Sequence, residues 1–329
     1  MCQPIDLIIP WVDGNDPAWQ QEKAQTVGLD GDQRVIRYRD WGFMKYWLRG
    51  VEKFLPWVRT VHLVTWGHLP PGLRQDHPKL HIVNHRDYIP PQFLPTFNCN
   101  VIELNFFRIP ELAEQFILAN DDTFFLRPME PEFFFRNGLP VDAAIQNVLQ
   151  FSRPDGIDAI VMNDLLALNM NFNKKKAVAA NRSKWFNPRY GSGFFRNLYL
   201  MPFTNFTGFR DPHMPAGYLK SVFEEVYTAC REQMESTFAN KVRTKQDLNE
   251  WLCRYWQFAA GQFTPGDPHR GAFTVIGKDD ERIADILKRQ SEPMICLSDD
   301  DEKIDFEREQ AFLTAAFEAL LPEKSSFEL

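Results

Sequence analysis

The sequence lacks the features that mark several common classes of protein. Its five cysteines are scattered and odd in number, and none forms a Cys-x-x-Cys pair, so neither a zinc site nor a disulfide framework is indicated. No apolar run approaches the roughly 20 residues of a membrane span, and no signal peptide is visible at the N-terminus. Neither a repeat at solenoid spacing nor a long low-complexity linker is present. We therefore expect a globular cytoplasmic protein with reduced thiols.

The chain also lacks an excess of positive charge. Its 37 Lys and Arg residues are outnumbered by 44 Asp and Glu, and the net charge of −7 argues against nucleic acid as a partner. An anionic nucleotide would need a metal ion and a few arginines close to it. Aromatic residues are abundant, at 14% with 29 Phe and 9 Trp, which favours a folded protein with a pocket. The 329 residues suffice for one large domain or two intimate ones.

The first 140 residues alternate between strand and helix patterns. Short apolar runs predict strands at residues 5–12, 58–65, 81–84 and 116–119. Apolar residues at helical spacing predict helices over residues 41–54 and 100–114. Such alternation predicts an α/β fold, with a mostly parallel central sheet flanked by helices.

The second half has a different pattern. Residues 150–212 are enriched in Asn, Lys, Arg, Phe and Gly and look loop-rich or irregularly helical. Further helices are predicted over residues 219–238, 246–258 and 306–321, and one late strand at 294–297. We predict a single domain over residues 1–329 with three parts: an α/β half (1–150), a loop-rich insertion (151–212) and a helical half with a late strand (213–329).

Two adjacent acids, Asp121 and Asp122, follow Asn120 at the end of the fourth predicted strand. Neighbouring carboxylates are costly to desolvate unless a cation meets them. Hard oxygen ligands of this kind suit Mg²⁺ or Mn²⁺ holding a diphosphate. The alternative is that both acids face water or cap the next turn.

Acids follow two other predicted strands as well. Asp13 and Gly14 come after the first strand, and Asp299 after the late one. Ligands bind at the carboxyl ends of strands in open α/β sheets. Gly14 would let the backbone approach a ligand, and Asp13 would accept a hydrogen bond from a base or ribose. The alternative is a tight Asp-Gly turn without a ligand.

Four blocks of residues follow one another in the order found in a known family. They are Trp-Val-Asp-Gly at 11–14, the long stretch from Arg-Tyr-Arg-Asp at 37–40 to Asn-Asp-Asp at 120–122, His-Met-Pro at 213–215 with Arg-Thr at 243–244, and Cys-Leu-Ser-Asp at 296–299 with residues 321–328. Together they resemble the Stealth family of hexose-1-phosphate transferases. That family includes bacterial capsular polysaccharide phosphotransferases and the animal N-acetylglucosamine-1-phosphotransferase.

The resemblance implies a fold, a reaction and partners. The fold would be of the nucleotide-diphospho-sugar transferase type (GT-A or Rossmann-like), with the helical half completing the active site. The enzyme would transfer hexose-1-phosphate or N-acetylhexosamine-1-phosphate to a glycan hydroxyl and release a nucleoside monophosphate. A UDP-N-acetylhexosamine is the implied donor, Mg²⁺ or Mn²⁺ the cofactor, and bacterial capsule or cell-surface polysaccharide the product.

The resemblance also implies roles for individual residues. Asp121, Asp122 and Asp299 would bind the metal, with Asp122 also counted as catalytic. His213 would be the general base, with Asp211 orienting its ring, and Arg243 would stabilise charge on the transferring phosphoryl group. The donor would be bound by Trp11, Asp13, Gly14, Asp40, Arg49, Arg108 and Asn120. For Arg49 and Arg108 a structural ion pair is the alternative. We expect Asp122, Asp299, His213 and Arg243 to line one pocket, with Asp13 on its nucleotide side.

Some residues depart from the family pattern, and other functions are conceivable. Phe107, Ser298 and Trp66 replace residues common in the family, which leaves the donor sugar open. The closest alternative is a conventional glycosyltransferase that releases a nucleoside diphosphate, and a more distant one is a glycan-binding module. For Lys174-Lys175-Lys176 a solvated surface is the simplest interpretation, and an acceptor groove or a contact with an anionic membrane is the alternative.

Overall fold

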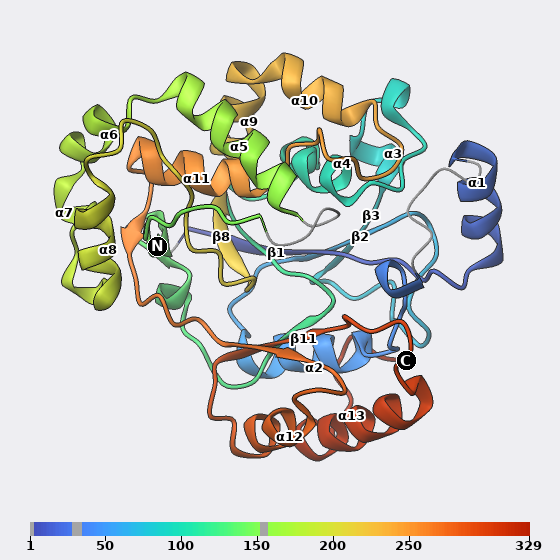
Figure 1. The fold of residues 1–329 in the computed structure, drawn as a ribbon. Coiled ribbons are helices and arrows are strands. Elements are labelled where there is room, and N and C mark those ends of the chain that lie inside the picture. The colour runs from blue at the N-terminus through green and yellow to red at the C-terminus, as the bar shows by residue number, and fades with distance from the viewer. Residues whose placement is uncertain (1–2, 28–34, 152–156) are drawn as a thin grey trace.

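The computed structural model describes residues 3–27, 35–151 and 157–329 and is built around a five-stranded sheet (Figure 1). The strand order is β3 (Leu80–Asn84), β2 (Val61–Thr65), β1 (Ile5–Pro10), β4 (Gln115–Leu118) and β8 (Ala216–Leu219). The first four strands are parallel, and β8 pairs antiparallel with β4. The predicted α/β fold with a mostly parallel central sheet is therefore confirmed, and β8 is an addition that the sequence pattern did not predict.

The strand β1 carries a buried acid, Asp6, in an otherwise apolar sequence. Its carboxylate accepts hydrogen bonds from Arg59 Nε (2.7 Å) and from the Ala113 amide (2.8 Å), and lies 3.0 Å from His62 Nε2. Burial alone would raise the pKa of Asp6, but His62 and Arg59 outweigh it and hold this pKa below its usual value. This network fastens β1 to β2 and to the chain before β4.

The late strand β11 (Met294–Ser298) belongs to a second sheet of three strands. It lies between β10 (Ala272–Val275) and β5 (Thr123–Phe125), parallel to the former and antiparallel to the latter. We expected the acids to follow strands of one parallel sheet, and this is wrong for Asp299. The turn at residues 120–122 leads from β4 into β5, so Asp122 lies at the junction of the two sheets, beside β11.

Helices cover both sheets. In Figure 1, α9 (Lys220–Ala229), α10 (Arg231–Phe238) and α11 (Trp251–Ala260) lie above the central sheet. Below it lie α2 (Met44–Phe54), α12 (Asp280–Arg289) and α13 (Phe306–Leu320), next to β11. The predicted helix over 100–114 is shorter, because α4 (Cys99–Leu104) gives way to a 3₁₀ turn (Phe106–Arg108) just before Pro110. Another helix, α1 (Pro17–Val27), was not predicted.

The segment expected to be loop-rich or irregularly helical contains four helices in its described part. They are α5 (Asp158–Asn171), α6 (Lys174–Ala180), α7 (Arg182–Trp185) and α8 (Ser192–Leu200). Buried apolar residues such as Trp185 and Leu168 face the rest of the molecule. No helix among the described residues combines the length and apolar character needed to cross a bilayer.

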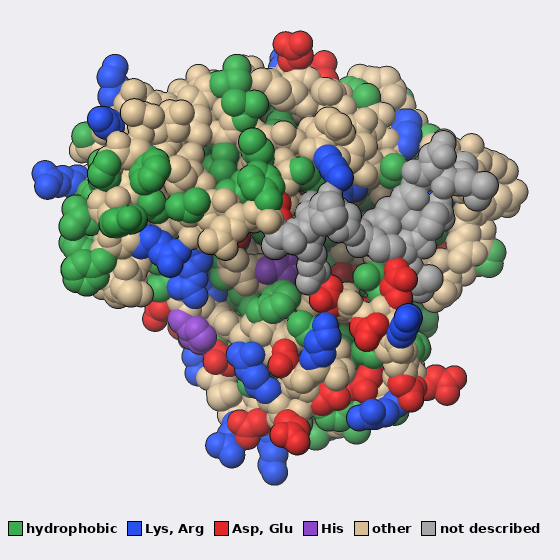
Figure 2. Space-filling view, in the orientation of Figure 1, with side chains coloured by type: hydrophobic (Ala, Val, Ile, Leu, Met, Phe, Trp, Pro, Cys, Tyr) green, Lys and Arg blue, Asp and Glu red, His purple; other side chains and the backbone are tan. Residues whose placement is uncertain are grey.

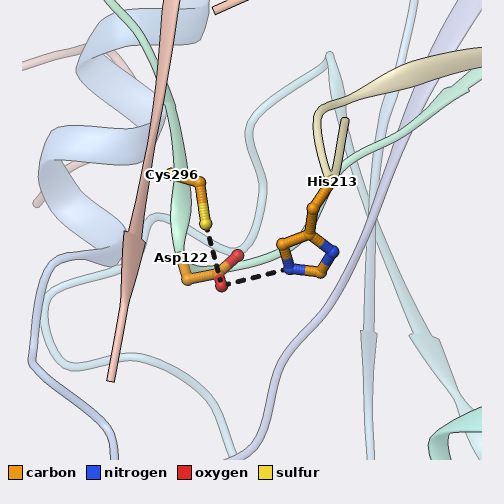
Figure 3. Close-up of side chains that lie close together, drawn as sticks. All are labelled: Asp122, His213 and Cys296. Atoms are coloured by element: carbon orange, nitrogen blue, oxygen red, sulfur yellow. Dashed lines mark hydrogen bonds and ion pairs between the residues drawn. The ribbon is translucent and has the colours of Figure 1, made fainter. Parts of the chain in front are cut away.

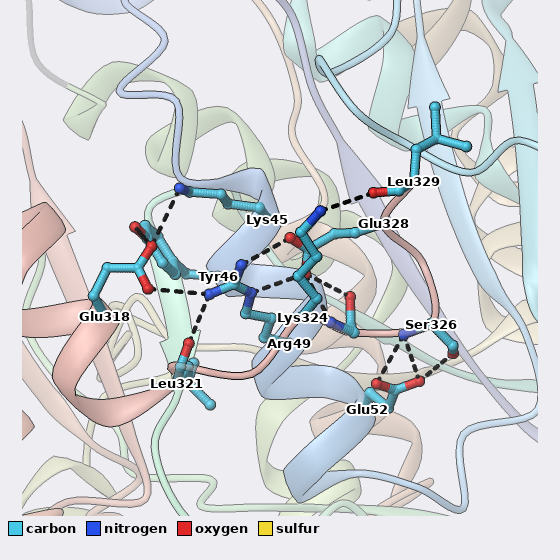
Figure 4. Close-up of polar contacts among 11 residues, drawn as sticks. Lys45, Tyr46, Arg49, Glu52, Glu318, Leu321, Lys324, Ser326, Glu328 and Leu329 are labelled. Carbon is cyan, nitrogen blue, oxygen red and sulfur yellow. Dashed lines mark hydrogen bonds and ion pairs between the residues drawn. The ribbon is translucent and has the colours of Figure 1, made fainter.

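Arg49 of α2 holds the C-terminal residues in place (Figure 4). Its guanidinium forms two parallel 2.8 Å hydrogen bonds with the Glu328 carboxylate and a 2.7 Å bond with the Leu321 carbonyl. Glu318 lies 3.4 Å away and adds a further charge. Arg49 thus forms the structural ion pair that was the alternative to donor binding.

Candidate active site

Two neighbouring recesses meet at the turn between β4 and β5. The first, which we call the His213 recess, encloses about 1090 Å³ of empty space, part of it open to solvent. Six of the site residues predicted from the sequence line it, namely Trp11, Asn120, Asp121, Asp122, His213 and Arg243. The second, the Asp299 recess, is lined by Trp11, Asp40, Asp121, Asp122 and Asp299. Trp11, Asp121 and Asp122 border both, whereas Asp299 and His213 lie in different recesses.

Asp122, His213 and Cys296 come together from three distant segments (Figure 3). One oxygen of Asp122, Oδ2, lies 3.5 Å from His213 Nε2 and accepts a hydrogen bond from Cys296 Sγ at 3.4 Å. The three potential ligand atoms lie within 4.8 Å of one another. Asp122 raises the pKa of His213 above its ordinary value, although burial opposes this change. Burial beside Asp122 also raises the pKa of the Cys296 thiol, which keeps it protonated.

The residues around Asp122 fit a divalent cation. Its second oxygen, Oδ1, is buried and has no hydrogen-bond partner among the described residues, an arrangement that a cation would satisfy. Asp121 adjoins it at the mouth of both recesses and remains accessible to solvent. Desolvation by surrounding protein atoms raises the pKa of Asp121 to about 7, and the negative charges of Asp122 and Asp40 contribute to this rise. Two adjacent carboxylates, one of them desolvated by its surroundings, are an attractive site for Mg²⁺ or Mn²⁺.

Asp299 was predicted as a third metal ligand, but its carboxylate is engaged elsewhere. It lies 3.0 Å from Arg39 Nη1 and accepts a hydrogen bond from Trp41 Nε1 at 3.3 Å. Burial raises its pKa, and Arg39 opposes this rise. Asp40, the residue between these two partners, lines the same recess and accepts a 3.0 Å hydrogen bond from the Gly42 amide. Asp299 therefore fixes the 39–41 segment against the end of β11.

His213 has a backbone conformation that non-glycine residues rarely adopt, with φ = 49°. Such a strained position persists only where the surrounding structure enforces it. Asp211 provides that anchor: its carboxylate forms an ion pair with Arg254 and accepts a 2.6 Å hydrogen bond from the Tyr255 hydroxyl. Asp211 therefore holds the backbone before His213 and does not orient its ring, contrary to our expectation. Asp122 is the residue that faces the imidazole.

Arg254 links this anchor to Asp142, the last residue of the strand β7 (Leu139–Asp142), and its removal should be costly. Arg254 Nε and Nη2 donate to the buried Asp142 carboxylate at 2.7 and 2.8 Å. We expect Arg254→Met to lower the free energy of unfolding by about 3–5 kcal/mol, because it leaves a buried carboxylate without its cation. Urea denaturation would measure this loss. Arg289→Met removes an exposed ion pair with Asp285 and serves as control, with an expected loss of about 1 kcal/mol or less. Equal losses in the two variants would contradict the assignment.

Arg243 enters the His213 recess from the loop before α11. Asp247 fixes this loop, because its carboxylate accepts hydrogen bonds from Asn98 (2.7 Å) and Asn100 (3.1 Å) at the start of α4. Arg243 Nη2 donates to Cys99 Sγ at 3.2 Å, while its buried Nε has no partner among the described residues. A cationic fork with an unused donor that borders a recess suits a phosphate group.

Asp13 and Gly14 form the turn that we gave as the alternative to a ligand contact. Asp13 Oδ1 accepts a 2.8 Å hydrogen bond from the Asn15 amide, as Asx turns do. A Cβ at Gly14 would lie 2.2 Å from the Tyr38 carbonyl oxygen, so the glycine is required by a neighbouring backbone segment. Neither residue lines the two recesses.

Arg108 also lies outside both recesses. Its guanidinium lies 4.6 Å from the ring centres of Phe107 and Tyr227, and its Nε donates to Asn105 Oδ1 at 3.0 Å. These contacts are structural, so the position of Arg108 does not favour donor binding. The sequence analysis gave no role to Cys296, which lies beside Asp122, or to Glu103, which lines the His213 recess. Both stand in blocks shared with the family, but a single Cys or Glu in an apolar stretch does not by itself indicate a site.

Comparison with known proteins adds an independent line of evidence. Residues 3–29 match the model of Stealth protein CR1, conserved region 1, and residues 37–141 that of Stealth protein CR2, conserved region 2. The chain is 41% identical to a capsular polysaccharide phosphotransferase WcwK of Streptococcus pneumoniae, covering 99% of this chain and 98% of that protein. It is 37% identical to the exopolysaccharide phosphotransferase cps2G of Lactiplantibacillus plantarum, covering 98% and 96%. It is 35% identical to the receptor polysaccharide phosphotransferase WefC of Streptococcus gordonii over all of both chains. The resemblance seen in the sequence is confirmed, and the chain belongs to the Stealth family.

Proposed function

We propose that the protein is a metal-dependent sugar-1-phosphate transferase of bacterial capsule or cell-surface polysaccharide synthesis. The observation that carries the proposal is the Asp122 carboxylate, which has one oxygen near His213 and a second, buried oxygen without a hydrogen-bond partner among the described residues. Arg243 borders the same recess. The relatives named as polysaccharide phosphotransferases support the same class of reaction.

The chemistry follows from these groups. Asp121 and Asp122 would hold Mg²⁺ or Mn²⁺, which supplies positive charge to the diphosphate of the donor. The ring nitrogen of His213 that does not face Asp122 takes the proton from the acceptor hydroxyl, as the hydroxyl oxygen forms a bond to the sugar-linked phosphorus. The bond from this phosphorus to the nucleoside monophosphate breaks, and the product is a phosphodiester. Arg243 stabilises the charge that builds on the transferring phosphoryl oxygens.

The charge of Asp122 serves His213 as well. By raising the pKa of His213, it makes the imidazole a stronger base than a histidine in water. The anchored, left-handed backbone at His213 supplies the fixed position that proton transfer requires. The same carboxylate thus supports both the base and the cation site.

The identity of the leaving nucleotide tests the proposal against a conventional glycosyltransferase. We expect the protein, incubated with Mg²⁺ or Mn²⁺, a glycan acceptor and a panel of UDP-, GDP- and CDP-sugars, to release a nucleoside monophosphate. A UDP-N-acetylhexosamine is the expected donor and UMP the expected product, identified by chromatography. Release of UDP would instead show attack at the sugar carbon and contradict phosphotransfer. Asp122→Asn protein in the same panel controls for contaminating hydrolases.

A further inference from the structure

The surface formed by the helices α5 to α8 and the loop segments beside them exposes an unusual number of apolar side chains. Of the eleven large apolar side chains that are exposed among the described residues, nine lie between residues 148 and 203. They are Val148, Phe151, Met162, Leu166, Met170, Phe195, Leu198, Tyr199 and Phe203. Apolar residues that gather on one surface, in contrast to scattered ones, mark a site of interaction. We call this surface the α5–α8 face.

The helical spacing of these residues shows that they form coherent faces. Met162, Leu166 and Met170 are each four residues apart and project from one side of α5, while Val161, Leu165 and Leu168 on its other side are buried. Phe195 and Tyr199 stand likewise on one side of α8, with exposed fractions of 69% and 78%. Both helices therefore have a second apolar side beyond the one that packs on the protein.

The charge of the α5–α8 face is opposite to that of the whole chain. Residues 165–210 contain no Asp or Glu, although the net charge of the chain is −7. The same stretch contains eight cationic residues, six of which are exposed: Lys175, Lys176, Arg182, Arg189, Arg196 and Arg210. Where their hydrogen bonds are seen, the acceptors are neutral, namely the Pro265 carbonyl for Arg189 and Asn147 for Arg196. Figure 2 shows the result at its upper left, where green and blue side chains lie together over these helices.

We propose that the α5–α8 face docks on the anionic surface of a phospholipid bilayer. The apolar side chains would enter the headgroup region, and the six cations would lie against anionic headgroups. The charge pattern selects this partner over a second copy of the chain, because a symmetric dimer through this face would oppose like charges. A solvated lysine surface, the simplest interpretation of the Lys run alone, leaves the apolar residues unexplained.

Docking in this way would place the catalytic groups near the membrane. Only two residues separate Arg210, at the end of the face, from His213, and Asp211 between them is anchored to Arg254. The face is therefore joined to the candidate active site by a short segment that the structure holds in place. The proposal goes beyond phosphotransfer and does not depend on it.

Vesicle sedimentation of the purified full chain, without donor or acceptor, tests the proposal. We expect binding to vesicles of phosphatidylcholine mixed with phosphatidylglycerol, weakening as salt is added, and little binding to phosphatidylcholine alone. Lys175→Gln/Lys176→Gln/Arg182→Gln should lower the partition coefficient by roughly 100-fold, since each cation near the surface contributes independently. Phe195→Ser/Tyr199→Ser should lower it by roughly 10-fold or more. All five side chains are exposed, so circular dichroism should show unchanged folds.

A matched control distinguishes the face from general electrostatic attraction. Lys278→Gln/Lys288→Gln/Lys303→Gln removes three exposed lysines outside the face, as many cations as the first variant, and should leave vesicle binding unchanged. The proposal is wrong if the wild-type chain stays in the supernatant with anionic vesicles. It is equally wrong if the charge variant and the Phe195→Ser/Tyr199→Ser variant both bind these vesicles as strongly as the wild-type chain. It is also wrong if size-exclusion chromatography shows a dimer that Phe195→Ser/Tyr199→Ser dissociates while vesicles are not bound. Because no turnover is measured, each of these results leaves the phosphotransferase proposal to its own test.

Discussion

Asp122→Asn is expected to lower turnover by about 10³-fold or more while the fold is kept. The substitution preserves the size of the side chain but removes the charge that a cation on Oδ1 requires and that supports His213. A cation on a transferring phosphoryl group supplies several kcal/mol of transition-state stabilisation, and about 4 kcal/mol corresponds to about 10³-fold in rate. Steady-state release of the nucleotide, with thermal unfolding as a check on the fold, measures the effect.

Asp285→Asn on the exposed surface of α12 is the control for the loss of one negative charge, and it should turn over as the wild type does. Titration of metal into EDTA-treated protein adds a second readout, since Asp122→Asn should need much more metal for half-maximal activity. If folded Asp122→Asn enzyme kept near wild-type turnover in EDTA-treated buffer, the assignment of Asp122 as a metal ligand would be wrong.

Replacement of His213 should affect the rate of reaction far more than donor binding. Loss of a positioned general base costs roughly 10²–10⁴-fold in kcat, and we expect this loss with a nearly unchanged KM for the donor. Because φ is 49° at this position, Ala would be strained, whereas Asn tolerates the left-handed region. His213→Asn therefore isolates the chemistry, and His213→Ala adds the cost of the backbone. Stopped assays over a range of donor concentrations separate kcat from KM.

His213→Asn serves as the control for the backbone strain expected in His213→Ala. If both variants lose kcat and His213→Asn unfolds at the wild-type temperature, the lost base accounts for the effect. If His213→Asn keeps the wild-type kcat and only donor affinity falls, His213 binds the donor and another group accepts the proton.

The presence of the first four strands and their parallel arrangement could be predicted, because local patterns indicate them. Short apolar runs indicate β1, β2, β3 and β4, and the helical patterns after β1 and before β4 indicate crossovers between parallel strands. The strand β8 escaped prediction because it is only four residues long, contains Gly217 and exists through its pairing with β4. The helices α5 to α8 could not be delimited from the sequence. Apolar residues lie on two sides of these helices, which weakens the periodic pattern by which a helix is predicted.

The candidate site was predictable where its residues are neighbours in sequence and unpredictable where partners are distant. Asp121 and Asp122 stand out as adjacent acids at the end of a strand. The partner of Arg49 could not be inferred, because Glu328 lies 279 residues away. Asp299 was expected near Asp122 on one sheet edge, and it is near through a second sheet whose existence no local pattern indicates.

The ion pair between Arg49 and Glu328 has a consequence for synthesis of the protein on the ribosome. The arginine is only 6% exposed and is made early, whereas its carboxylate partner is made 279 residues later. Until then the nascent chain holds a cation that must either stay hydrated or be buried without its counter-charge, so α2 cannot settle in its final position. We therefore expect α2 to reach its final position only after the C-terminal residues are released, and a chain interrupted before residue 328 to be more sensitive to proteases.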